Sequence, residues 1–397
     1  MTDPFAQAAL HHVAVTPKRG DAAMRVLTPD DFARAWDEIT AWDGYAPTPL
    51  VSLPGLAGQI GVGHIAYKHE GPRFGLGSFK ALGGAYAALR VLQRELGTRL
   101  GHPVTLADIR GGAYAEACAG ITLSSATDGN HGRSLAWGCQ RVGAPCRIYI
   151  HAEVSETRAQ AMRDLGADVV RIDGDYDASV DLARTEADEN GWFVVSDTSW
   201  DGYADPPRDV MAGYGVMTRE ACEAMEDAPS HVILQGGVGG LAASVAAYLR
   251  QHWGDDAPRV IITEPDRAAC LYESAQKGVP TTVPIHEETI MAGLSCGEPS
   301  EMAWAILREE AQDFVTMPDS IVAPTMRLLA NGDSGDAQIE AGESAVAGLA
   351  TLIAVMRQPD MAAALGLDAQ SRVLLIGSEG VTDPAIFAAI MAGADHV

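Results

Sequence analysis

The strongest constraint on the fold is the alternation of short, continuously apolar runs with helical segments. Seven apolar runs indicate strands, at residues 121–125, 146–150, 169–172, 193–196, 231–234, 260–263 and 373–376. Helical segments such as 156–165 and 178–189 lie between several of these runs. Continuous apolar strands joined by helices predict parallel strands covered on both faces. We therefore expect an α/β protein with open, doubly wound, mostly parallel sheets.

Charge and cysteine content exclude several classes of protein. The chain has 53 acidic and 28 basic residues, a net charge of −25, which disfavours binding to nucleic acid or to an anionic membrane. No apolar run is long enough to span a membrane, and the first twenty residues lack the apolar core of a signal peptide, so we expect a cytoplasmic protein. The six cysteines form no C-x-x-C pair and predict no metal site. We interpret most of them as buried, inert thiols, with pairing of Cys270 and Cys296 as the alternative.

A glycine-rich segment follows the strand predicted at 231–234 and precedes a helix predicted at 241–251. It reads Gln235-Gly236-Gly237-Val238-Gly239-Gly240. Glycines allow several backbone N–H groups to approach one anion, and the helix N-terminus adds positive potential. The segment has neither the lysine of a P-loop nor the spacing of a dinucleotide site. It predicts a phosphate cradle, or otherwise a tight turn that needs only flexible backbone.

A single lysine stands in small and apolar surroundings, Gly75-Leu76-Gly77-Ser78-Phe79-Lys80-Ala81-Leu82-Gly83-Gly84. It begins a helix of small residues predicted at 81–92. Most lysines are solvated surface groups. Desolvation here would lower the pKa of the amine, which suits imine formation and proton transfer.

Polar residues follow two further predicted strands. Thr127-Asp128-Gly129-Asn130-His131 comes after strand 121–125 and opens a helix. Asp and Asn are also ordinary helix caps, and we interpret His131 as a packing residue rather than a catalyst.

Polar residues also follow two more of the predicted strands and form turns there. Asp197 follows strand 193–196, and Ser378-Glu379-Gly380 follows the last strand, 373–376. Each of these also suits a simple turn.

Taken together and in this order, these segments resemble the fold-type II pyridoxal-phosphate (PLP) enzymes, which include threonine dehydratases and cysteine synthases. The resemblance runs from about residue 45 to about residue 385. Dehydratases usually have serine where this chain has Thr127, and Asp128 adds an acidic side chain. With Asp-Thr-x-Trp-x-Gly-Tyr at 197–203, Met-Ala-Gly-Leu-x-Cys-Gly-Glu at 291–298, Gly-Glu-Ser at 342–344 and the insertion at 97–120, the chain is similar to the diaminopropionate ammonia-lyase family.

The resemblance implies a set of cofactor contacts. Lys80 would hold PLP covalently, the glycine-rich loop its phosphate, and Asn130 the 3′-oxygen of its ring. A hydroxyl at Ser378 facing the pyridine nitrogen would not favour ring protonation, which favours prompt β-elimination. The implied cofactor contacts are Lys80, Phe79, Asn130, Gly236, Gly237, Val238, Gly239, Gly240 and Ser378.

The implied reaction is α,β-elimination of ammonia from 2,3-diaminopropionate, giving pyruvate and ammonia through aminoacrylate. Carboxylates at Asp128 and Asp197 suit a substrate with a second ammonium group. We assign Lys80 as the base for the L-isomer and Asp128 as the base for the D-isomer, with Asp197 as a further catalytic residue. The predicted substrate contacts are Thr127, Asp128, Gly129 and Asp197.

The alternatives are a threonine, serine or hydroxyaspartate dehydratase, a synthase that adds a nucleophile to the aminoacrylate, or a non-catalytic phosphate-binding protein. We expect a large PLP-binding domain at 1–86 and 191–397 with a small domain, 87–190, inserted in it. The cofactor would lie in the cleft between the two sheets, and the family resemblance implies a homodimer.

Overall fold

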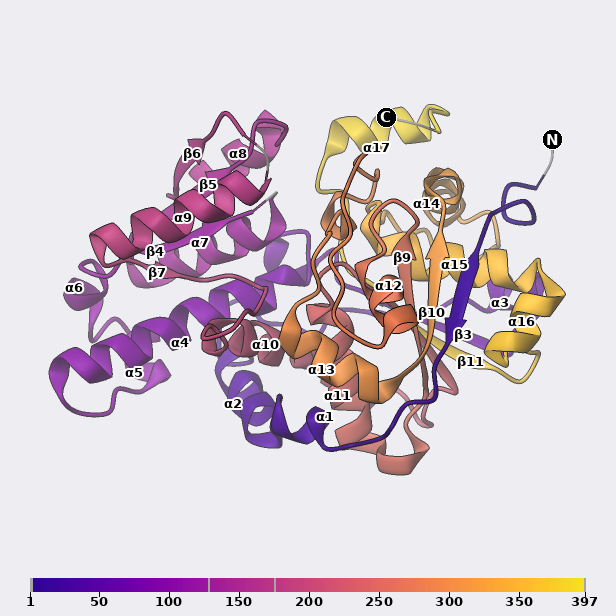
Figure 1. The fold of residues 1–397 in the computed structure, drawn as a ribbon, viewed down its shortest axis with the longest axis horizontal. Coiled ribbons are helices and arrows are strands. Elements are labelled where there is room, and N and C mark those ends of the chain that lie inside the picture. Colours follow the sequence, from indigo (N-terminus) through magenta and orange to yellow (C-terminus); the bar gives the residue numbers. More distant parts are fainter. Residues whose placement is uncertain (1–2, 128, 175, 396–397) are drawn as a thin grey trace. The chain divides into compact units, whose positions relative to one another are not determined.

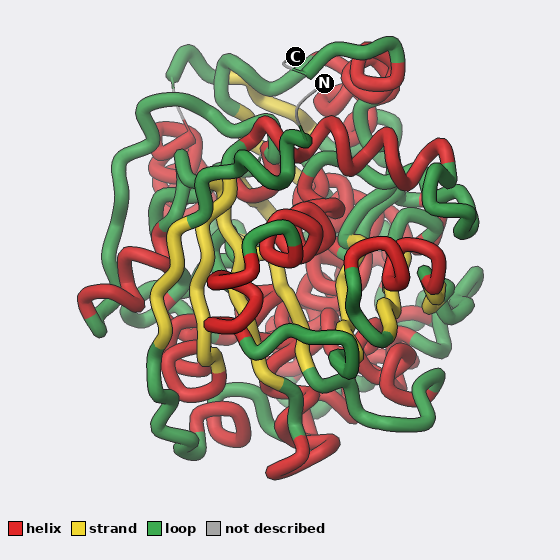
Figure 2. The backbone as a smooth tube through the Cα atoms, turned by 90° about the vertical axis from the view of Figure 1, so that its right-hand side faces the viewer, coloured by secondary structure: helices red, strands yellow, loops and turns green. Residues whose placement is uncertain are grey.

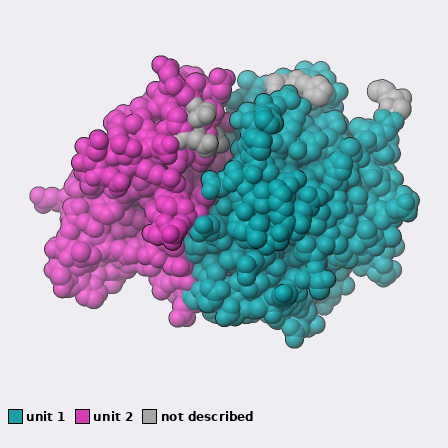
Figure 3. Space-filling view, viewed as in Figure 1, with its two compact units in different colours: residues 1–29, 47–78, 217–397 teal, residues 30–46, 79–216 magenta. Residues whose placement is uncertain are grey.

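The computed structural model describes residues 3–127, 129–174 and 176–395. Contacts divide the chain into two compact units (Figure 3): unit 1 consists of residues 1–29, 47–78 and 217–397, and unit 2 of residues 30–46 and 79–216. Unit 2 contains the whole of the predicted insertion 87–190 and extends beyond it at both ends. One reason is helix α4, which runs unbroken from Lys80 to Leu100 and keeps residues 80–86 with those that follow. The assignment of residues 1–86 and 191–397 as the PLP-binding domain stays a prediction.

Unit 1 is built on a seven-stranded sheet of order β1-β10-β9-β8-β11-β3-β2 (Figures 1 and 2). The five central strands pair in parallel, whereas β1 and β2 pair antiparallel at the two edges. The strands are β1 (His11–Ala14), β2 (Leu50–Ser52), β3 (His64–His69), β8 (His231–Gln235), β9 (Arg259–Pro265), β10 (Ala311–Met317) and β11 (Arg372–Gly377).

Helices cover this sheet and close its core. Helix α15 (Ala347–Met356) packs on β8, β9 and β11, and its leucines and isoleucine join sheet residues such as Ile233 and Ile261 in the buried core. Helix α11 (Gly240–Trp253) packs on β8 and against α13 (Glu301–Glu310). The other helices of unit 1 are α1 (Ala22–Arg25), α3 (Pro54–Ile60), α12 (Cys270–Lys277), α14 (Val322–Asn331), α16 (Pro359–Leu365) and α17 (Pro384–Met391). Short 3₁₀ turns are η1 (Arg73–Gly75), η2 (Gly254–Asp256), η3 (Ala292–Leu294), η4 (Asp319–Ile321) and η5 (Ser344–Val346).

Unit 2 contains a four-stranded, wholly parallel sheet of order β6-β5-β4-β7, with helices around it (Figure 1). Its strands are β4 (Leu123–Ala126), β5 (Cys146–Ile150), β6 (Asp168–Arg171) and β7 (Phe193–Val194). Its helices are α2 (Pro29–Ile39), α4, α5 (Leu106–Arg110), α6 (Ala115–Cys118), α7 (Asn130–Val142), α8 (Glu156–Arg163) and α9 (Tyr176–Asn190). Helix α10 (Asp205–Glu223) begins in unit 2 and ends in unit 1.

Helices α4 and α7 pack closely because small residues face each other. A Cβ added at Gly138 would lie 2.6 Å from the Cα of Ala85, and one at Gly84 would lie 2.8 Å from Oγ of Ser134. The Ser134 hydroxyl accepts a hydrogen bond from the amide of Ala85, 2.9 Å away. The helix that begins with Lys80 is therefore fixed against the helix that follows β4.

The predicted fold class is confirmed: both sheets are predominantly parallel, and helices connect most of their successive strands. All seven predicted strands exist, with ends that differ by up to two residues. The apolar-run pattern missed β1, β2, β3 and β10. Two of these contain fully buried charged side chains, Lys68 in β3 and Asp313 in β10, which interrupt the apolar runs.

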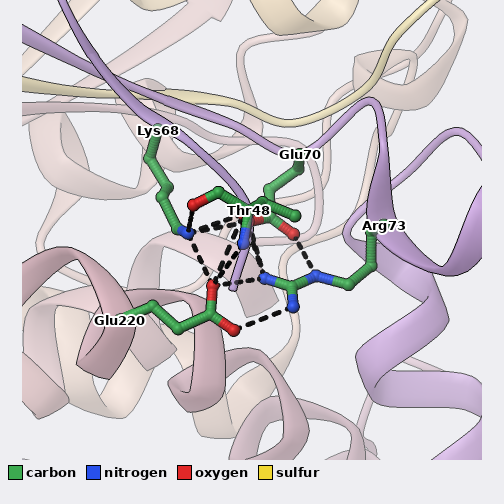
Figure 4. Close-up of polar contacts among 5 residues, drawn as sticks. All are labelled: Thr48, Lys68, Glu70, Arg73 and Glu220. Carbon is green, nitrogen blue, oxygen red and sulfur yellow. Dashed lines mark hydrogen bonds and ion pairs between the residues drawn. The ribbon is translucent and has the colours of Figure 1, made fainter. Parts of the chain in front are cut away.

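The buried charge of β3 belongs to an ion cluster inside unit 1, consisting of Thr48, Lys68, Glu70, Arg73 and Glu220 (Figure 4). Lys68 Nζ lies 2.5 Å from Glu220 Oε2, and Arg73 Nε lies 2.8 Å from Glu70 Oε2. Arg73 also donates to Glu220 over 2.8 Å, and Lys68 donates to the carbonyl of Thr48 over 2.6 Å. Two cations thus balance two anions, which is the condition for burying charge at acceptable cost.

Candidate active site

The polar residues singled out in the sequence stand at the carboxyl ends of parallel strands in both units. In unit 2, Thr127 follows β4 and Asp197 lies just beyond β7, and these two strands are neighbours in the sheet. In unit 1, the glycine-rich loop follows β8 and Ser378 follows its neighbour β11. This is the edge at which open α/β sheets bind ligands.

The chemical centre of unit 2 is an ion pair between Lys80 and Asp197. Lys80 is the first residue of α4, and its ammonium lies within hydrogen-bond distance of Asp197 Oδ2. Both side chains are about four-fifths buried. Burial alone would raise the pKa of the Asp197 carboxyl, but the Lys80 ammonium outweighs it and holds that pKa well below its ordinary value. Asp197 therefore stays ionised at neutral pH.

His131 lies beside this pair with a defined orientation. Its Nε2 lies 2.8 Å from the carbonyl oxygen of Val195. A carbonyl can only accept, so Nε2 carries the proton and Nδ1 is the acceptor. Burial lowers the pKa of His131, which keeps the ring neutral. Nδ1 lies 4.0 Å from Asp197 Oδ2 and has no hydrogen-bond partner among the described residues. His131 is thus packed as the sequence suggested, but one ring nitrogen faces the ion pair.

The loop between β4 and α7 holds the other predicted residues of unit 2. The Thr127 hydroxyl accepts hydrogen bonds from the amides of Gly129 (3.2 Å) and Gly132 (3.3 Å), so it shapes the helix start. Asn130 is the first residue of α7. Asp128, the predicted second base, lies outside the described residues.

Two aromatic side chains pack beside Lys80. The Phe79 ring lies 5.7 Å from the Lys80 ammonium and 4.6 Å from the ring of Tyr214, on α10. The Tyr214 hydroxyl is buried and has no close hydrogen-bond partner within the described part of the chain. Tyr214 was not among the predicted site residues, because one tyrosine in an apolar helix of small residues carries no signal of its own.

The glycine-rich loop of unit 1 has the geometry of an anion cradle. Gly237 and Gly239 adopt the left-handed conformation (φ 61° and 95°), which other residues rarely adopt. Ordinary backbone bonds join the Gly236 amide to Thr263 O and the Gly239 amide to Gly236 O. Among the described residues, the amides of Gly237, Val238 and Gly240 have no such partner, and the N-terminus of α11 follows. Unpaired amides at a helix N-terminus form an anion site.

Glu264, at the end of β9, lies directly against this loop. A Cβ added at Gly236 would be 2.5 Å from Glu264 Cγ. The carboxyl accepts hydrogen bonds from the amides of Leu271 (3.1 Å) and Tyr272 (2.7 Å) at the start of α12. Complete burial raises its pKa to about 8, so the carboxyl is protonated at neutral pH. A neutral Glu264 does not repel an anion held by the loop.

Ser378 is held by a residue that the sequence analysis did not assign. Gln235 Nε2 donates to Ile376 O (2.6 Å), Ser344 O (3.2 Å) and Ser378 Oγ (3.4 Å). Because the Ser378 oxygen accepts from the amide, its own proton remains available for another acceptor. Gln235 lies at the end of β8, next to the glycines, and its amide is buried.

The cysteines are free thiols in the structure, and five of the six are buried. Cys270 Sγ lies 3.5 Å from Gly237 O and behaves as a packing residue of the loop. Cys296 is half-buried. No cluster of metal-ligating side chains occurs in residues 3–127, 129–174 and 176–395.

Comparison with known proteins shows to which family this chain belongs. A family model described as pyridoxal-phosphate dependent enzyme matches residues 41–379. The diaminopropionate ammonia-lyase of Escherichia coli K12 is 40% identical over 346 residues, which cover 86% of each chain. The chain belongs to the diaminopropionate ammonia-lyase family of PLP-dependent enzymes. This confirms the predicted resemblance and the predicted cofactor.

Other members of the family agree with this assignment. The diaminopropionate ammonia-lyase of Salmonella typhimurium LT2 is 38% identical over 353 residues, covering 86% of this chain and 87% of that one. The crystal structure of the Escherichia coli enzyme in complex with its aminoacrylate-PLP azomethine reaction intermediate has a TM-score of 0.87 at 34% identity, covering 98% of both chains. A D-serine dehydratase of Serratia proteamaculans is more distant, at 26% identity over 365 residues, 85% of this chain and 79% of that one.

The residues of this chain fit the chemical groups of PLP. The unpaired amides of the glycine-rich loop suit a phosphate, and the Lys80 amine suits an aldehyde. The available proton of Ser378 suits an unprotonated pyridine nitrogen. No helix in the described part of the chain is long and apolar enough to cross a membrane.

Proposed function

We propose that this protein eliminates ammonia from 2,3-diaminopropionate, giving one pyruvate and two ammonia from each substrate and one water. The observation that carries the proposal is the buried carboxylate of Asp197 beside the Lys80 amine. A fixed carboxylate next to the PLP-anchoring lysine attracts a second substrate ammonium, whereas it offers nothing to a neutral hydroxyl group. Relatives named diaminopropionate ammonia-lyase, about as long as this chain, support the same choice.

In this proposal Lys80 anchors PLP and later acts as the base at Cα of the L-isomer. PLP supplies an electron sink for the carbanion at Cα. Asp197 keeps an ionised carboxylate at the amine, so it orients an ammonium and accepts the hydrogen bond of the protonated lysine. Phe79 packs beside the amine and limits its access to water.

The unit 1 residues have binding roles in the proposal. The loop Gly236–Gly240 holds the phosphate of PLP through the amides of Gly237, Val238 and Gly240, which have no backbone partner among the described residues, with Glu264 neutral beside them. Ser378, held by Gln235, donates to the pyridine nitrogen. A hydroxyl partner leaves this nitrogen unprotonated, and prompt loss of the β-amino group is then favoured over longer-lived carbanion chemistry.

Asp128 is the proposed base for the D-isomer, and Thr127, Gly129 and Asn130 complete the contacts to substrate and cofactor. A base on the second face of the substrate is needed if both isomers react, because Lys80 reaches one face only. The capping bonds of the Thr127 hydroxyl favour a role in which it shapes the loop that carries these groups.

The experiment is a comparison of PLP-loaded wild-type, Lys80→Ala and Asp128→Asn proteins with D- and L-diaminopropionate, L-threonine and D-serine. We expect the visible absorbance of bound cofactor and all turnover to be lost in Lys80→Ala. Asp128→Asn should reduce turnover of the D-isomer at least about 100-fold, the size of a general-base contribution, and spare the L-isomer.

The control is Asp37→Asn, an exposed carboxylate on α2, which should change neither rate. Faster ammonia release from threonine or D-serine than from diaminopropionate would replace the proposal by a dehydratase. Equal losses for both isomers in Asp128→Asn would remove the division between two bases.

We also propose that the protein is a cytoplasmic homodimer. Its cysteines are free and mostly buried, as in proteins of reducing compartments. Light scattering of the purified protein measures the assembly directly, and a mass near the monomer value of 41.7 kDa would contradict the dimer.

A further inference from the structure

The hydroxyl of Tyr214 is an unexplained polar group next to Lys80. The side chain is 1% exposed, and among the described residues its oxygen has no close hydrogen-bond partner; Lys80 acts on it as a more distant one. Buried hydroxyl groups without partners are rare because they have lost hydration and gained nothing in return. Such a group either has a functional partner or costs the free energy of its lost hydration without return. Phenylalanine at this position would avoid that cost.

The packing of the ring directs this hydroxyl to the amine-bearing face of α4. Tyr214 stacks obliquely on Phe79, with 4.6 Å between ring centroids and 56° between planes. The hydroxyl-bearing end of the ring lies over Gly83, where an added Cβ would be 2.9 Å from Cζ. Lys80 and Gly83 are three residues apart in a helix and share one face. A side chain larger than glycine at position 83 would displace the phenol from this place.

The charged groups that act on the phenol are Lys80 and Asp197. Burial raises the pKa of Tyr214 far above its ordinary value, Lys80 opposes this rise both as a charge and as a hydrogen-bond partner, and Asp197 adds to it. The phenol therefore keeps its proton at neutral pH. His131 faces the same ion pair from α7 and is neutral.

We propose that Tyr214 is a positioning residue that donates its hydroxyl proton to the Lys80 amine whenever this amine is neutral and free of cofactor. The phenol has no other acceptor among the described residues, so donation to a neutral amine satisfies it fully. An ammonium can donate to the phenol oxygen but cannot accept the phenol proton, which then stays unpaired. Tyr214 thus favours the neutral amine, while Asp197 favours the ammonium.

The two partners give the amine two balanced states. A neutral Lys80 held by Tyr214 is ready to accept a proton, and the ammonium that results transfers its hydrogen bond to Asp197. Because proton transfer is fastest when the pKa of the base lies near the working pH, this balance suits a catalytic base. This role rests on the proposed function, in which Lys80 is the base at Cα.

The test measures the Lys80 amine in the cofactor-free protein. Competitive labelling with a limiting amount of acetic anhydride across pH, read by mass spectrometry, gives the pKa of this one amine. Tyr214→Phe removes the hydroxyl and keeps the ring on Phe79. We expect the pKa of Lys80 to rise by about one unit, so that its labelling at neutral pH slows about tenfold. An unchanged or lowered pKa in Tyr214→Phe would refute the proposal.

The matched control is Tyr86→Phe, a buried tyrosine of the same helix α4 whose hydroxyl has Arg34 as a partner. It should leave Lys80 labelling unchanged, and an equal shift in this control would assign the effect to general loosening of the helix. The unfolding temperature separates the variants further, because Tyr214→Phe should not lower it whereas Tyr86→Phe should.

In the PLP-loaded enzyme, Tyr214→Phe should also change the pH dependence of kcat for L-diaminopropionate. The pKa that describes the acidic limb of this profile should rise by the same amount as the pKa of Lys80. Labelling needs neither cofactor nor substrate, so failure of the proposed function and failure of this inference are distinguishable. If Tyr214→Phe shifts the labelling of Lys80 but the wild-type enzyme does not turn over diaminopropionate, the positioning role of Tyr214 stands. Only the proposed reaction is then refuted.

Discussion

At the scale of single residues, the site depends on groups whose protonation is set by burial. Glu264 and Asp197 are both carboxyl groups in largely buried positions, yet their pKa values move in opposite directions. Asp197 has the Lys80 ammonium as a partner, whereas Glu264 has only backbone amides and a thiol. The same residue type is therefore an anion near the amine and a neutral group near the anion cradle.

Glu264 leads to a prediction about pH. Its pKa is raised from an ordinary 4.5 to about 8 in the folded chain, so its contribution to stability is fully present below pH 4.5 and is lost as pH rises through 8. Glutamine does not ionise, so Glu264→Gln should match the wild type near pH 5 and unfold at a higher temperature at pH 9. We expect a gap on the order of 5 °C in thermal unfolding of the cofactor-free proteins. A gap that is the same at both pH values would contradict the buried, neutral carboxyl.

At the scale of elements, the buried ion cluster ties three parts of unit 1 together. Lys68 and Glu70 come from β3 and its end, Arg73 from η1, and Glu220 from the last turns of α10. Beyond η1, the Gly77 carbonyl accepts from the amide of Gly380, and Ser78 forms a β-bridge with Glu379. The cluster therefore holds the segment that leads into Lys80, and the turn of Ser378 is bonded to that segment.

The cluster predicts strong coupling between Lys68 and Glu220. Glu220→Leu leaves two buried cations with one anion, and Lys68→Met leaves two anions with one cation, so each should lose about 3–5 kcal/mol of unfolding free energy. The double variant Lys68→Met with Glu220→Leu leaves the balanced pair of Glu70 and Arg73. It should recover most of either loss. Urea unfolding of the four proteins measures the coupling, and losses that simply add would show that the charges act independently.

At the scale of the whole molecule, the chain passes between the two units four times, so neither unit is a continuous segment. The glycine-rich loop and Ser378, which are proposed to bind PLP, follow β8 and β11 of the unit 1 sheet, whose strands come from three separate stretches of the chain. Binding of one small molecule is therefore linked to the folding of distant stretches of chain. Such a ligand stabilises the folded protein by mass action.

We expect PLP at 100 times its dissociation constant to add about 2.7 kcal/mol to the unfolding free energy of the cofactor-free protein, which raises its unfolding temperature by several degrees. Pyridoxal, which lacks the phosphate, should give a smaller rise at equal concentration because it leaves the glycine-rich loop empty. Lys80→Ala should also reduce the effect of PLP. Differential scanning fluorimetry distinguishes these cases, and equal shifts with PLP and pyridoxal would argue against the loop as the phosphate site.

The sequence by itself determined the fold class and the positions of the loops that carry chemistry, and the cofactor followed from the resemblance of those segments to a known family. These depend on local patterns: apolar runs of strand length, glycines after a strand, and a lysine in small-residue surroundings. Each pattern reflects the physics of a few neighbouring residues, and the structure places Thr127, Asp197, the glycine-rich loop and Ser378 beyond the carboxyl ends of strands. The roles of the predicted site residues remain proposals.

Only the tertiary structure decided which polar groups are partners. Strand β3 was missed because Lys68 is charged, and its burial is possible only with Glu220, 152 residues further along the chain. Tyr214, Gln235 and Glu264 were likewise not assigned, because their meaning lies in contacts with Phe79, Ser378 and α12. The pKa of a buried group depends on which groups surround it in space, and local sequence does not contain that information. Lys80 was recognised from its neighbours in sequence, but its balance between Asp197 and Tyr214 was visible only in the fold.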